Sequence, residues 1–233
     1  MQDLRVDAPA YDEDFFESSA AARSAVVRHI HSRTRYALAK RGFDLIVACG
    51  LLILTTPIWL FAALLIRITS RGPVVYGQER IGKDGQPFIC YKFRTMVEGA
   101  HDLREQLLDL NRMTGPVFKT PDDPRVTTVG RWLRKSSVDE LPQLLNVLRG
   151  EMSIVGPRPQ SQEEVDRYGP SEWGRLSVKP GMTCVWQVSG RMLVDPQTRM
   201  QMDLDYARQC SFAYDCVLVL RTIPAVLTGR GAY

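Results

Sequence analysis

The chain has 233 residues and a formal net charge of +4, a length that allows one domain with a sizeable core and an added segment. Its five cysteines are scattered without a CxxC pair, and its three histidines all lie at or before position 101. This composition argues against a zinc centre and a histidine-based triad, and it favours reduced thiols in a cytosol-like compartment.

The beginning of the chain differs in charge from the rest. Residues 1–20 hold six acids against one base, Arg5, which leaves 29 bases and 20 acids, a net charge of +9, in the remainder. A basic body indicates an anionic partner: nucleic acid, a phosphorylated substrate or an anionic membrane surface. We expect residues 1–35 to form a mobile tail, acidic at first and basic toward its end.

Residues 45–66 are uncharged and mostly apolar. At about 1.5 Å per residue, a helix over these 22 positions could cross a bilayer core of about 30 Å. The core of a soluble protein seldom needs so long an uncharged stretch, and the run begins too far along the chain for a cleaved signal peptide. We therefore expect a membrane segment within residues 36–70.

Both flanks of this run are basic, so the rule that positive charge stays on the cytoplasmic side gives no orientation. A helix that enters and returns on the same side satisfies both flanks. Pro57 removes one helix hydrogen bond near the middle, and the hydroxyls of Thr55 and Thr56 can satisfy freed carbonyls. We favour a broken, re-entrant helix with its break at Thr56-Pro57 over a straight span. Asp44 is expected to pair with Arg41 at the membrane edge.

Residues 71–233 are expected to form one small α/β domain that is mostly helical, with amphipathic helices at the membrane interface. The GKDG segment between two apolar runs predicts a β-hairpin. Gly150 is placed to end a helix, and Asp195 followed by Pro196 to begin another. The expected elements are a hairpin over 72–96, helices over 101–113, 131–135 and 140–149, a short apolar run at 152–159, a turn, strand and loop over 179–191, a helix from 195, and an interfacial or packed helix pair over 211–227.

Asp139 and Glu140 stand side by side in SSVDELPQLLN, residues 136–146. One explanation is helix capping, because Ser136 and Ser137 each begin an S-x-x-[DE] pattern and acids favour a first turn. The other explanation is a working pair of carboxylates among cations. Adjacent residues of a helix point about 100° apart, which suits two separate tasks better than one shared proton.

Basic residues lie on both sides of this pair. Arg134 precedes it, Arg158 is held between two prolines, and Lys92 and Arg94 close the second strand of the hairpin. If they converge, they form a phosphate-binding pocket in which an aspartate stays ionised and can act as a nucleophile, while the neighbouring carboxylate holds Mg²⁺. The chain has neither a P-loop nor a GxGxxG motif, so the pattern predicts phosphoryl transfer by a carboxylate rather than an ordinary nucleotide-triphosphate enzyme.

Four stretches carry a resemblance to a known family: KRGFDLIVA, YGQERIGKDGQPFICYKFRTM, DDPRVTTVGRWLRKSSVDELPQLLNVLRGEMSIVGPRP and KPGMTCVWQVSGR. Over about residues 40–233 the chain resembles the bacterial sugar transferases, also called monotopic phosphoglycosyl transferases or undecaprenyl-phosphate hexose-1-phosphate transferases. The resemblance implies a re-entrant helix broken at Thr56-Pro57 and a catalytic domain on the cytoplasmic face of the bacterial inner membrane. The end of the chain is similar to members that start exopolysaccharide synthesis with glucose or galactose.

The resemblance also implies a reaction. Asp139 would attack the β-phosphate of a UDP-hexose, UMP would leave, and undecaprenyl phosphate would take the sugar phosphate from the aspartate. Glu140 would help to bind Mg²⁺. Arg134 and Arg158 would hold phosphate groups.

For four further residues two roles stay open. Lys92 and Arg94 either hold phosphate or form a pair on the surface of the hairpin. Gln187 and Arg191, in WQVSGR, either contact the nucleotide or sugar or shape a loop. Cys184 stands where many members of the family have glycine, and this difference bears on the contacts of that loop.

Two other functions would fit parts of the sequence. A non-catalytic membrane scaffold for polysaccharide assembly would need the same anchor and acidic tail, but the intact Asp-Glu pair favours an enzyme. A nucleic-acid-binding protein would explain the basic body, but no motif of that kind is present, so we expect no nucleic-acid partner. A homodimer through the soluble domain is open, and the sequence leaves the sugar undecided.

Overall fold

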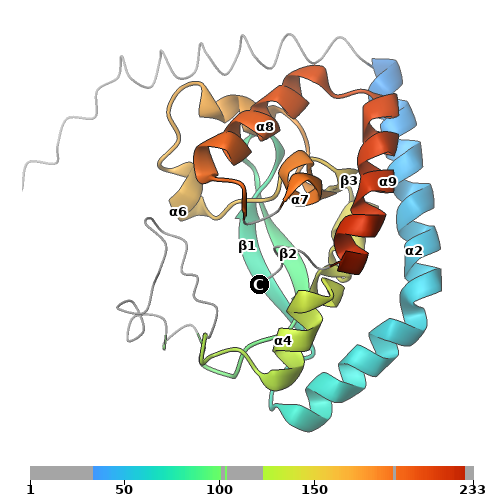
Figure 1. The fold of residues 1–233 in the computed structure, drawn as a ribbon, viewed down its shortest axis with the longest axis vertical. Helices are drawn as coiled ribbons and strands as arrows, with labels where there is room; N and C mark the ends of the chain where they lie inside the picture. Colours follow the sequence, from blue (N-terminus) through green and yellow to red (C-terminus); the bar gives the residue numbers. More distant parts are fainter. Residues whose placement is uncertain (1–33, 101–102, 104–122, 191–192, 229–233) are drawn as a thin grey trace, which may run out of the picture.

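The computed structural model describes residues 34–100, 103, 123–190 and 193–228. Within these residues helices predominate, and the strands form two separate two-stranded sheets (Figure 1). The prediction of an α/β fold that is mostly helical is confirmed. Residues 1–33 of the expected tail, and all but residue 103 of the helix expected over 101–113, lie outside the described part.

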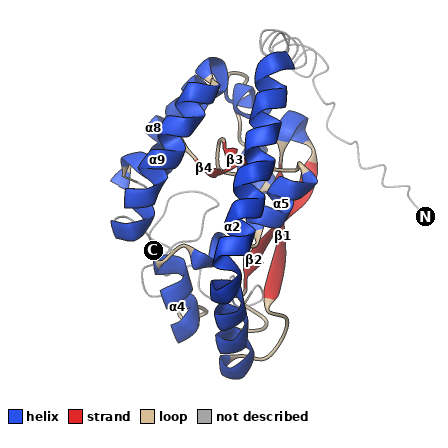
Figure 2. Cartoon of the chain, turned by 90° about the vertical axis from the view of Figure 1, so that its right-hand side faces the viewer, coloured by secondary structure: helices blue, strands red, loops and turns tan. Residues whose placement is uncertain are grey.

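Figure 2 shows that α2 runs along the length of the molecule, with α9 on one side and α5 and the strands β1 and β2 on the other. In chain order, with η for a 3₁₀-helix, the elements are α2 (Thr34–Thr69), β1 (Val75–Ile81), η1 (Lys83–Gly85), β2 (Pro87–Phe93), α4 (Thr128–Lys135), η3 (Val138–Glu140), α5 (Gln143–Arg149), β3 (Ser153–Val155), α6 (Gln162–Val165), η4 (Glu172–Ser177), β4 (Gly181–Thr183), α7 (Val185–Ser189), α8 (Pro196–Gln209) and α9 (Phe212–Thr228).

Helix α2 continues through Pro57 as one helix of 36 residues, not as two helices separated by a break. Figure 1 shows that it is bent, and we attribute the bend to Pro57, because proline removes a backbone hydrogen bond and crowds the preceding turn. The hydroxyls of Thr55 and Thr56 donate to the carbonyls four residues earlier, at 2.6 and 2.7 Å. The carbonyl that Pro57 frees is that of Ile53, so these threonines do not replace the lost bond.

One helix of the described residues, at Tyr36–Thr69, is long and apolar enough to cross a membrane. Only 11% of an apolar 18-residue stretch of this helix is buried inside the protein. Large side chains such as those of Ile53, Leu60 and Leu64 are exposed on its outer face. Because so large an exposed apolar surface is unfavourable in water, α2 is suited to contact with a membrane.

The first half of α2 is fixed to the domain by polar contacts, and the expected pairing of Asp44 with Arg41 is wrong. The buried Asp44 carboxylate accepts hydrogen bonds from Ser153 Oγ at 2.9 Å and from Ile154 N at 3.0 Å. Arg41 donates to two carbonyls in the last turn of α5, at 2.6 and 2.7 Å. A cation is favoured there because the last carbonyls of a helix lack helical donors.

Strands β1 and β2 form the predicted hairpin. They pair antiparallel from Val75 opposite Phe93 to Ile81 opposite Pro87. The GKDG turn between them places Asp84 in the left-handed region, with φ of 56°. The end of β2 therefore returns to the end of α2, where Phe93 packs with its ring 5.1 Å from that of Trp59.

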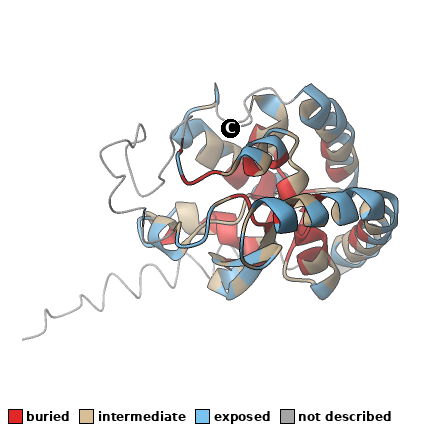
Figure 3. Cartoon of the chain, turned by 90° about the horizontal axis from the view of Figure 1, so that it is seen from below, coloured by how far each residue is buried: buried red, intermediate tan, exposed pale blue. Residues whose placement is uncertain are grey.

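Strands β3 and β4 form a short parallel sheet, with Ser153 opposite Gly181 and Val155 opposite Thr183. The two chains approach closely here, because a Cβ added to Gly181 would lie 2.0 Å from Gly156 N. Figure 3 shows the buried segments gathered inside the surrounding helices. The core around β3 includes Leu144, Val147, Met152, Val155, Tyr206 and Leu218.

In the C-terminal third, two of the expected elements differ from those in the structure. The segment after residue 183, expected as strand and loop, forms the short helix α7. A short apolar run fits either structure, so its pattern alone could not distinguish them. The apolar segment from 212 is one helix, α9, which continues through Pro224, and not a helix pair. Asp195 caps α8 as predicted, accepting from Thr198 N at 2.9 Å, with Pro196 in the first turn.

A buried acid joins α9 to α2 and α8. Asp215 is fully buried, and its carboxylate accepts hydrogen bonds from Tyr36 Oη at 2.9 Å, Lys40 Nζ at 2.8 Å and Tyr206 Oη at 2.6 Å. Three donors replace the water that a buried carboxylate loses. This contact explains how α9 can carry an acid in an otherwise apolar sequence.

Candidate active site

Asp139 and Glu140 lie in η3, a single 3₁₀ turn between α4 and α5. The chain turns sharply into it at Ser137, which has φ of 58°. Ser136 ends α4 and donates its hydroxyl to carbonyls of the preceding turn, and Ser137 makes no side-chain cap bond to η3. Capping of η3 by these serines is therefore not observed, although both acids do lie in the first turn of η3, as that explanation expected.

Glu140 is held by two cations. Its Oε1 accepts from Arg158 Nη2 at 2.6 Å and from Lys92 Nζ at 3.0 Å. Burial alone would raise the pKa of Glu140, but the charges and hydrogen bonds of Arg158 and Lys92 outweigh it and hold this pKa well below its usual range. Glu140 is therefore an ionised, fixed carboxylate.

Asp139 has the opposite electrostatic situation. Burial raises its pKa to about 6, and the charges of Lys92, Arg134 and Arg158 act against burial without outweighing it. The expectation that surrounding cations keep Asp139 readily ionised is thus only partly right, because the two nearest donors bond to Glu140 instead. Two neighbouring carboxylates with separated pKa values are a frequent mark of a functional site.

Lys92 is brought to Glu140 because Asn146 fastens β2 to α5. The fully buried Asn146 side chain accepts from Tyr91 N at 3.0 Å and donates to Ile89 O at 2.6 Å. Its amide thereby pairs with the free edge of β2 as a neighbouring strand would. Sequence analysis missed this residue, for which the available signal was a polar side chain inside the leucine-rich run of α5.

Arg134 approaches the pair from α4. Its Nε donates to Thr95 Oγ1 at 3.0 Å. Burial lowers the pKa of Arg134 and the charge of Asp139 raises it, so the two groups interact electrostatically. Gly130 allows α4 to lie close enough for this contact, because a Cβ at Gly130 would lie 2.0 Å from Thr95 O.

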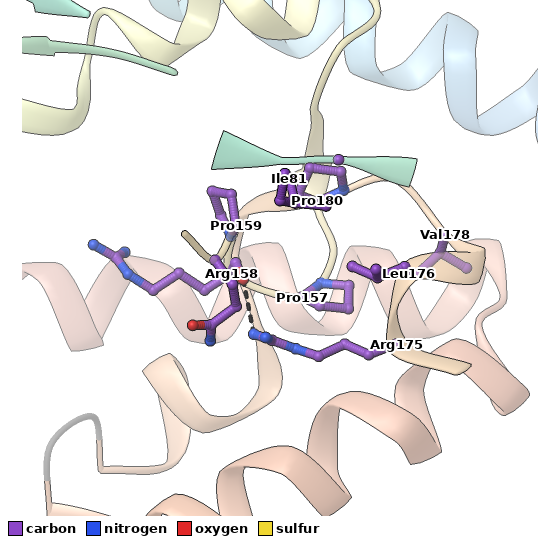
Figure 4. Close-up of a pocket in the computed structure, with 10 residues that line it drawn as sticks. Ile81, Pro157, Arg158, Pro159, Arg175, Leu176, Val178 and Pro180 are labelled. Atoms are coloured by element: carbon purple, nitrogen blue, oxygen red, sulfur yellow. Dashed lines mark hydrogen bonds between the residues drawn. The ribbon is translucent and has the colours of Figure 1, made fainter. Parts of the chain in front are cut away.

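Arg158 is carried by a loop that bonds to the rest of the domain on both sides. Ile81 N donates to Gln160 O at 2.9 Å, and Arg175 Nη2 donates to Arg158 O at 2.7 Å. Figure 4 shows that the Arg158 side chain extends away from the small pocket lined by its flanking prolines. The loop therefore presents the guanidinium outward, where it meets Glu140.

Among the described residues, no hydrogen bond joins Arg94 or Gln187 to the pair. Arg94 is buried and donates through Nη2 to Ser70 O and Ser70 Oγ, both at 2.9 Å, at the end of α2. Gln187 lies half-buried on α7. Arg191 lies outside the described residues. Cys184 precedes α7 with φ of −145°, an ordinary extended backbone, so the backbone at this position does not require glycine.

The carboxylate pair fits a magnesium ion only if substrate completes the site. The described residues contain no group of three histidine, cysteine or acidic side chains that could hold a metal. Asp139 and Glu140 are adjacent, and both donors to Glu140 use the same oxygen, Oε1. In phosphoryl-transfer sites Mg²⁺ takes one or two carboxylates and fills its other positions with phosphate and water. The donor set suits that arrangement and not a metal cage made by protein alone.

An apolar helix is fixed to a small domain, and the domain holds a carboxylate pair among arginines and a lysine, an arrangement that suits an enzyme for anionic substrates at a membrane. Comparison with known proteins gives the family. Residues 35–229 match the description "bacterial sugar transferase". The chain belongs to this family, which confirms the resemblance found in its motifs.

Three similar proteins illustrate the match. The exopolysaccharide production protein ExoY of Rhizobium meliloti is 44% identical over 200 residues, which cover 84% of this chain and 88% of that protein. The undecaprenyl-phosphate galactose phosphotransferase of Salmonella typhimurium is 42% identical over 199 residues, 83% of this chain and 41% of that protein. The UDP-glucose:undecaprenyl-phosphate glucose-1-phosphate transferase of Caulobacter vibrioides is 41% identical over 204 residues, 84% of this chain and 72% of that protein.

Proposed function

We propose that the protein transfers a hexose 1-phosphate from a UDP-hexose to undecaprenyl phosphate and releases UMP, as the first membrane step of exopolysaccharide synthesis. The observation that carries this proposal is the Asp139–Glu140 pair, in which Glu140 is held by Lys92 and Arg158 while the pKa of Asp139 is raised. The relatives named for undecaprenyl-phosphate transfer of galactose and glucose support the substrates, and the exopolysaccharide production protein supports the product.

Asp139 is the nucleophile in this proposal. Its carboxylate oxygen attacks the β-phosphorus of the UDP-hexose, the bond from that phosphorus to the bridging oxygen breaks, and UMP leaves with the electron pair. A hexose phosphate remains bound to Asp139 as an acyl phosphate. An oxygen of undecaprenyl phosphate then attacks the same phosphorus, which forms undecaprenyl-diphosphate-hexose and frees the carboxylate.

The geometry favours Asp139 over Glu140 for this role. Glu140 is fixed by two short charged hydrogen bonds, and its low pKa makes it a weak base. Asp139 is more basic because burial destabilises its charge, and greater basicity favours attack on phosphorus. Arg134, Arg158 and Lys92 supply the positive charge that a diphosphate needs as it enters.

Magnesium is part of the proposal. Glu140 would hold Mg²⁺ together with the diphosphate of the substrate, with Asp139 beside it. The ion, when bound, neutralises phosphate charge and so admits an anionic nucleophile. Chelation with EDTA is expected to stop UMP release, and added Mg²⁺ to restore it.

The proposed location is the cytoplasmic face of the bacterial inner membrane, with α2 as a re-entrant anchor. Its basic flanks and its exposed apolar surface support this arrangement. The acceptor carries its phosphate on a lipid, so an enzyme with an apolar helix attached to its site can reach it without extracting it from the bilayer.

The test measures UMP release by the full chain, purified in detergent with Mg²⁺ and undecaprenyl phosphate, over a panel of UDP-sugars. We expect release with one sugar and a loss of at least about 10³-fold in Asp139→Asn. A matched control is Asp205→Asn, which changes an exposed acid of α8 and should leave the rate unchanged. Without acceptor, mass spectrometry should find a hexose phosphate on the peptide that contains Asp139.

Two outcomes would contradict the proposal in different ways. Full activity of Asp139→Asn would remove the nucleophile assignment while leaving the transfer reaction in place. No UMP release with any sugar would favour the scaffold that the sequence left as an alternative.

A further inference from the structure

A second charged cluster lies buried behind the Arg158 loop and takes no part in the chemistry described above. Arg175 and Asp203 are only 3% and 1% exposed. Arg175 donates from Nε to Asp203 Oδ2 at 2.9 Å, and its Nη2 lies 2.8 Å from the same oxygen as part of the ion pair. Asp203 Oδ2 also accepts from Trp186 Nε1 at 3.3 Å. The acid therefore fixes the plane and direction of the Arg175 guanidinium.

The oriented guanidinium points its remaining donors at the Arg158 loop and at a tyrosine. Nη2 donates to Arg158 O at 2.7 Å, the bond drawn in Figure 4, and Nη1 donates to Tyr168 Oη. The side chain of Arg158 in turn donates from Nη2 to Glu140 Oε1 at 2.6 Å. Arg175 thus holds the backbone of Arg158, and the side chain of Arg158 holds Glu140.

We propose that Arg175, oriented by Asp203, is a positioning residue for the transfer reaction: it holds the Arg158 carbonyl and so aims the Arg158 side chain at Glu140 and the substrate phosphate. This inference rests on the proposed function. A buried ion pair seldom adds stability beyond that of a well-packed apolar pair, so stability alone does not explain its presence. An apolar pair could fill the same space but could not donate to the Arg158 carbonyl.

The test replaces both charges at once, with Arg175→Met combined with Asp203→Leu. This avoids leaving one buried charge unpaired, which could unfold the protein. We expect a folded protein in which kcat/KM for the UDP-sugar falls about 10- to 100-fold, the usual effect of losing a group that orients a contacting residue. Unchanged kcat/KM in the folded variant would overturn the proposal.

The matched control removes another buried ion pair, with Lys40→Met combined with Asp215→Leu. It has the same kind of change at the α2–α9 contact, and kcat/KM per folded molecule should stay within about twofold of wild type. A loss as large as that of the Arg175 variant would show a general structural effect and overturn the proposal.

A double-mutant cycle tests whether Arg175 acts through Arg158. In an Arg158→Ala background, adding Arg175→Met and Asp203→Leu should lower kcat/KM by less than a further factor of about two. The side chain that Arg175 positions is already absent from this background. A further tenfold loss would contradict this route.

A readout without turnover separates this inference from the proposed function. Amide hydrogen exchange at Gly156, Arg158 and Gln160, the residues of this loop that carry an amide hydrogen, should become faster in the Arg175 variant and stay unchanged in the Lys40 control. Unchanged exchange in the Arg175 variant would refute the positioning role even if no UDP-sugar were turned over. Faster exchange in a chain that releases no UMP would leave the loop contact supported and the transfer reaction rejected.

Discussion

Asp139 and Glu140 are neighbours in the sequence, yet their surroundings separate them chemically. Glu140 receives both nearby donors on one oxygen, and its pKa falls. Asp139 is buried, and its pKa rises. The separation arises because successive residues of a tight turn point in different directions, so a cation that bonds one cannot equally bond the other.

The pH dependence of the first transfer step follows from Asp139. The attacking form is the carboxylate, and the raised pKa means that this form is lost as pH falls through about 6. We expect kcat/KM for UMP release, which reports the ionisation of the free enzyme, to be constant above this pH and to fall about tenfold for each pH unit below it. A rate that does not change between pH 5 and 7 would exclude Asp139 as the group that titrates.

The raised pKa of Asp139 also predicts that its ionised carboxylate destabilises the folded protein. Because the pKa of Asp139 rises from 3.8 in the unfolded chain to about 6, the folded protein loses stability as pH rises through this window. Without Mg²⁺ and substrate, Asp139→Asn should therefore raise stability by up to about 3 kcal/mol above pH 6, and by little below pH 4. Thermal unfolding followed at both pH values measures this difference.

Glu140→Gln provides the contrast. The pKa of Glu140 is lowered in the folded protein, so its carboxylate stabilises the fold at neutral pH, and the neutral amide of the variant no longer balances the charges of Lys92 and Arg158. The melting temperature of this variant should fall at pH 7. A rise in both variants, or a fall in both, would contradict the separation of roles.

At the scale of elements, the site depends on how β2 and the loop that carries Arg158 are held against η3. Asn146 does this for β2, since its amide bonds the strand at Tyr91 N and Ile89 O. The hairpin itself supplies the strand geometry, but its pairing with β1 uses the other edge. One amide of α5 therefore fixes the distance between Lys92 and Glu140.

Replacing this amide should affect stability and activity together. Asn146→Leu keeps a similar volume but leaves two buried backbone groups without partners, which costs about 3 kcal/mol. We expect a melting temperature lower by roughly 6–12 °C and a reduced rate of UMP release. The control is Gln201→Leu on the exposed face of α8, which should change stability by less than about 0.5 kcal/mol. Equal effects of the two changes would show that Asn146 has no special role.

At the scale of the whole molecule, α2 links an apolar surface to the catalytic domain. Its outer face is exposed, while Asp44, Ala48, Ala62 and Ile66 are buried against the domain. The bend near its middle turns the second half toward α4, where Phe61 and Trp132 meet with ring centroids 6.5 Å apart. A helix attached to the domain at both ends is more compatible with a return to the same side than with a straight crossing.

Epitope tags at the two ends of the chain test this topology. In spheroplasts treated with protease, a re-entrant α2 should leave both tags protected, because both ends face the cytoplasm. Digestion of the N-terminal tag alone would establish a spanning helix. Pro57→Leu restores the missing helix donor and should straighten α2, so we expect this variant to increase the fraction whose N-terminal tag is digested.

Several features were predictable because their causes are local in sequence. The GKDG turn, the helix stop at Gly150 and the cap at Asp195 follow from backbone preferences of one or a few residues. The long uncharged run at 45–66 predicted a membrane-type helix from composition alone. Its continuation through Pro57 was not predicted, because proline can bend a helix or end it, and packing decides between the two.

The sequence by itself determined the family, the dyad and the membrane-type helix, because motifs, neighbouring acids and apolar length are properties of the chain in order. Only the tertiary structure decided which charges meet. Lys92 and Arg158 come to Glu140, while Arg94 goes to Ser70 and Arg175 to the Arg158 carbonyl. All four are arginine or lysine, so their side-chain type alone does not distinguish their partners. Their partners differ because strand ends, loop bonds and burial set the direction of each side chain, and these depend on residues far away along the chain.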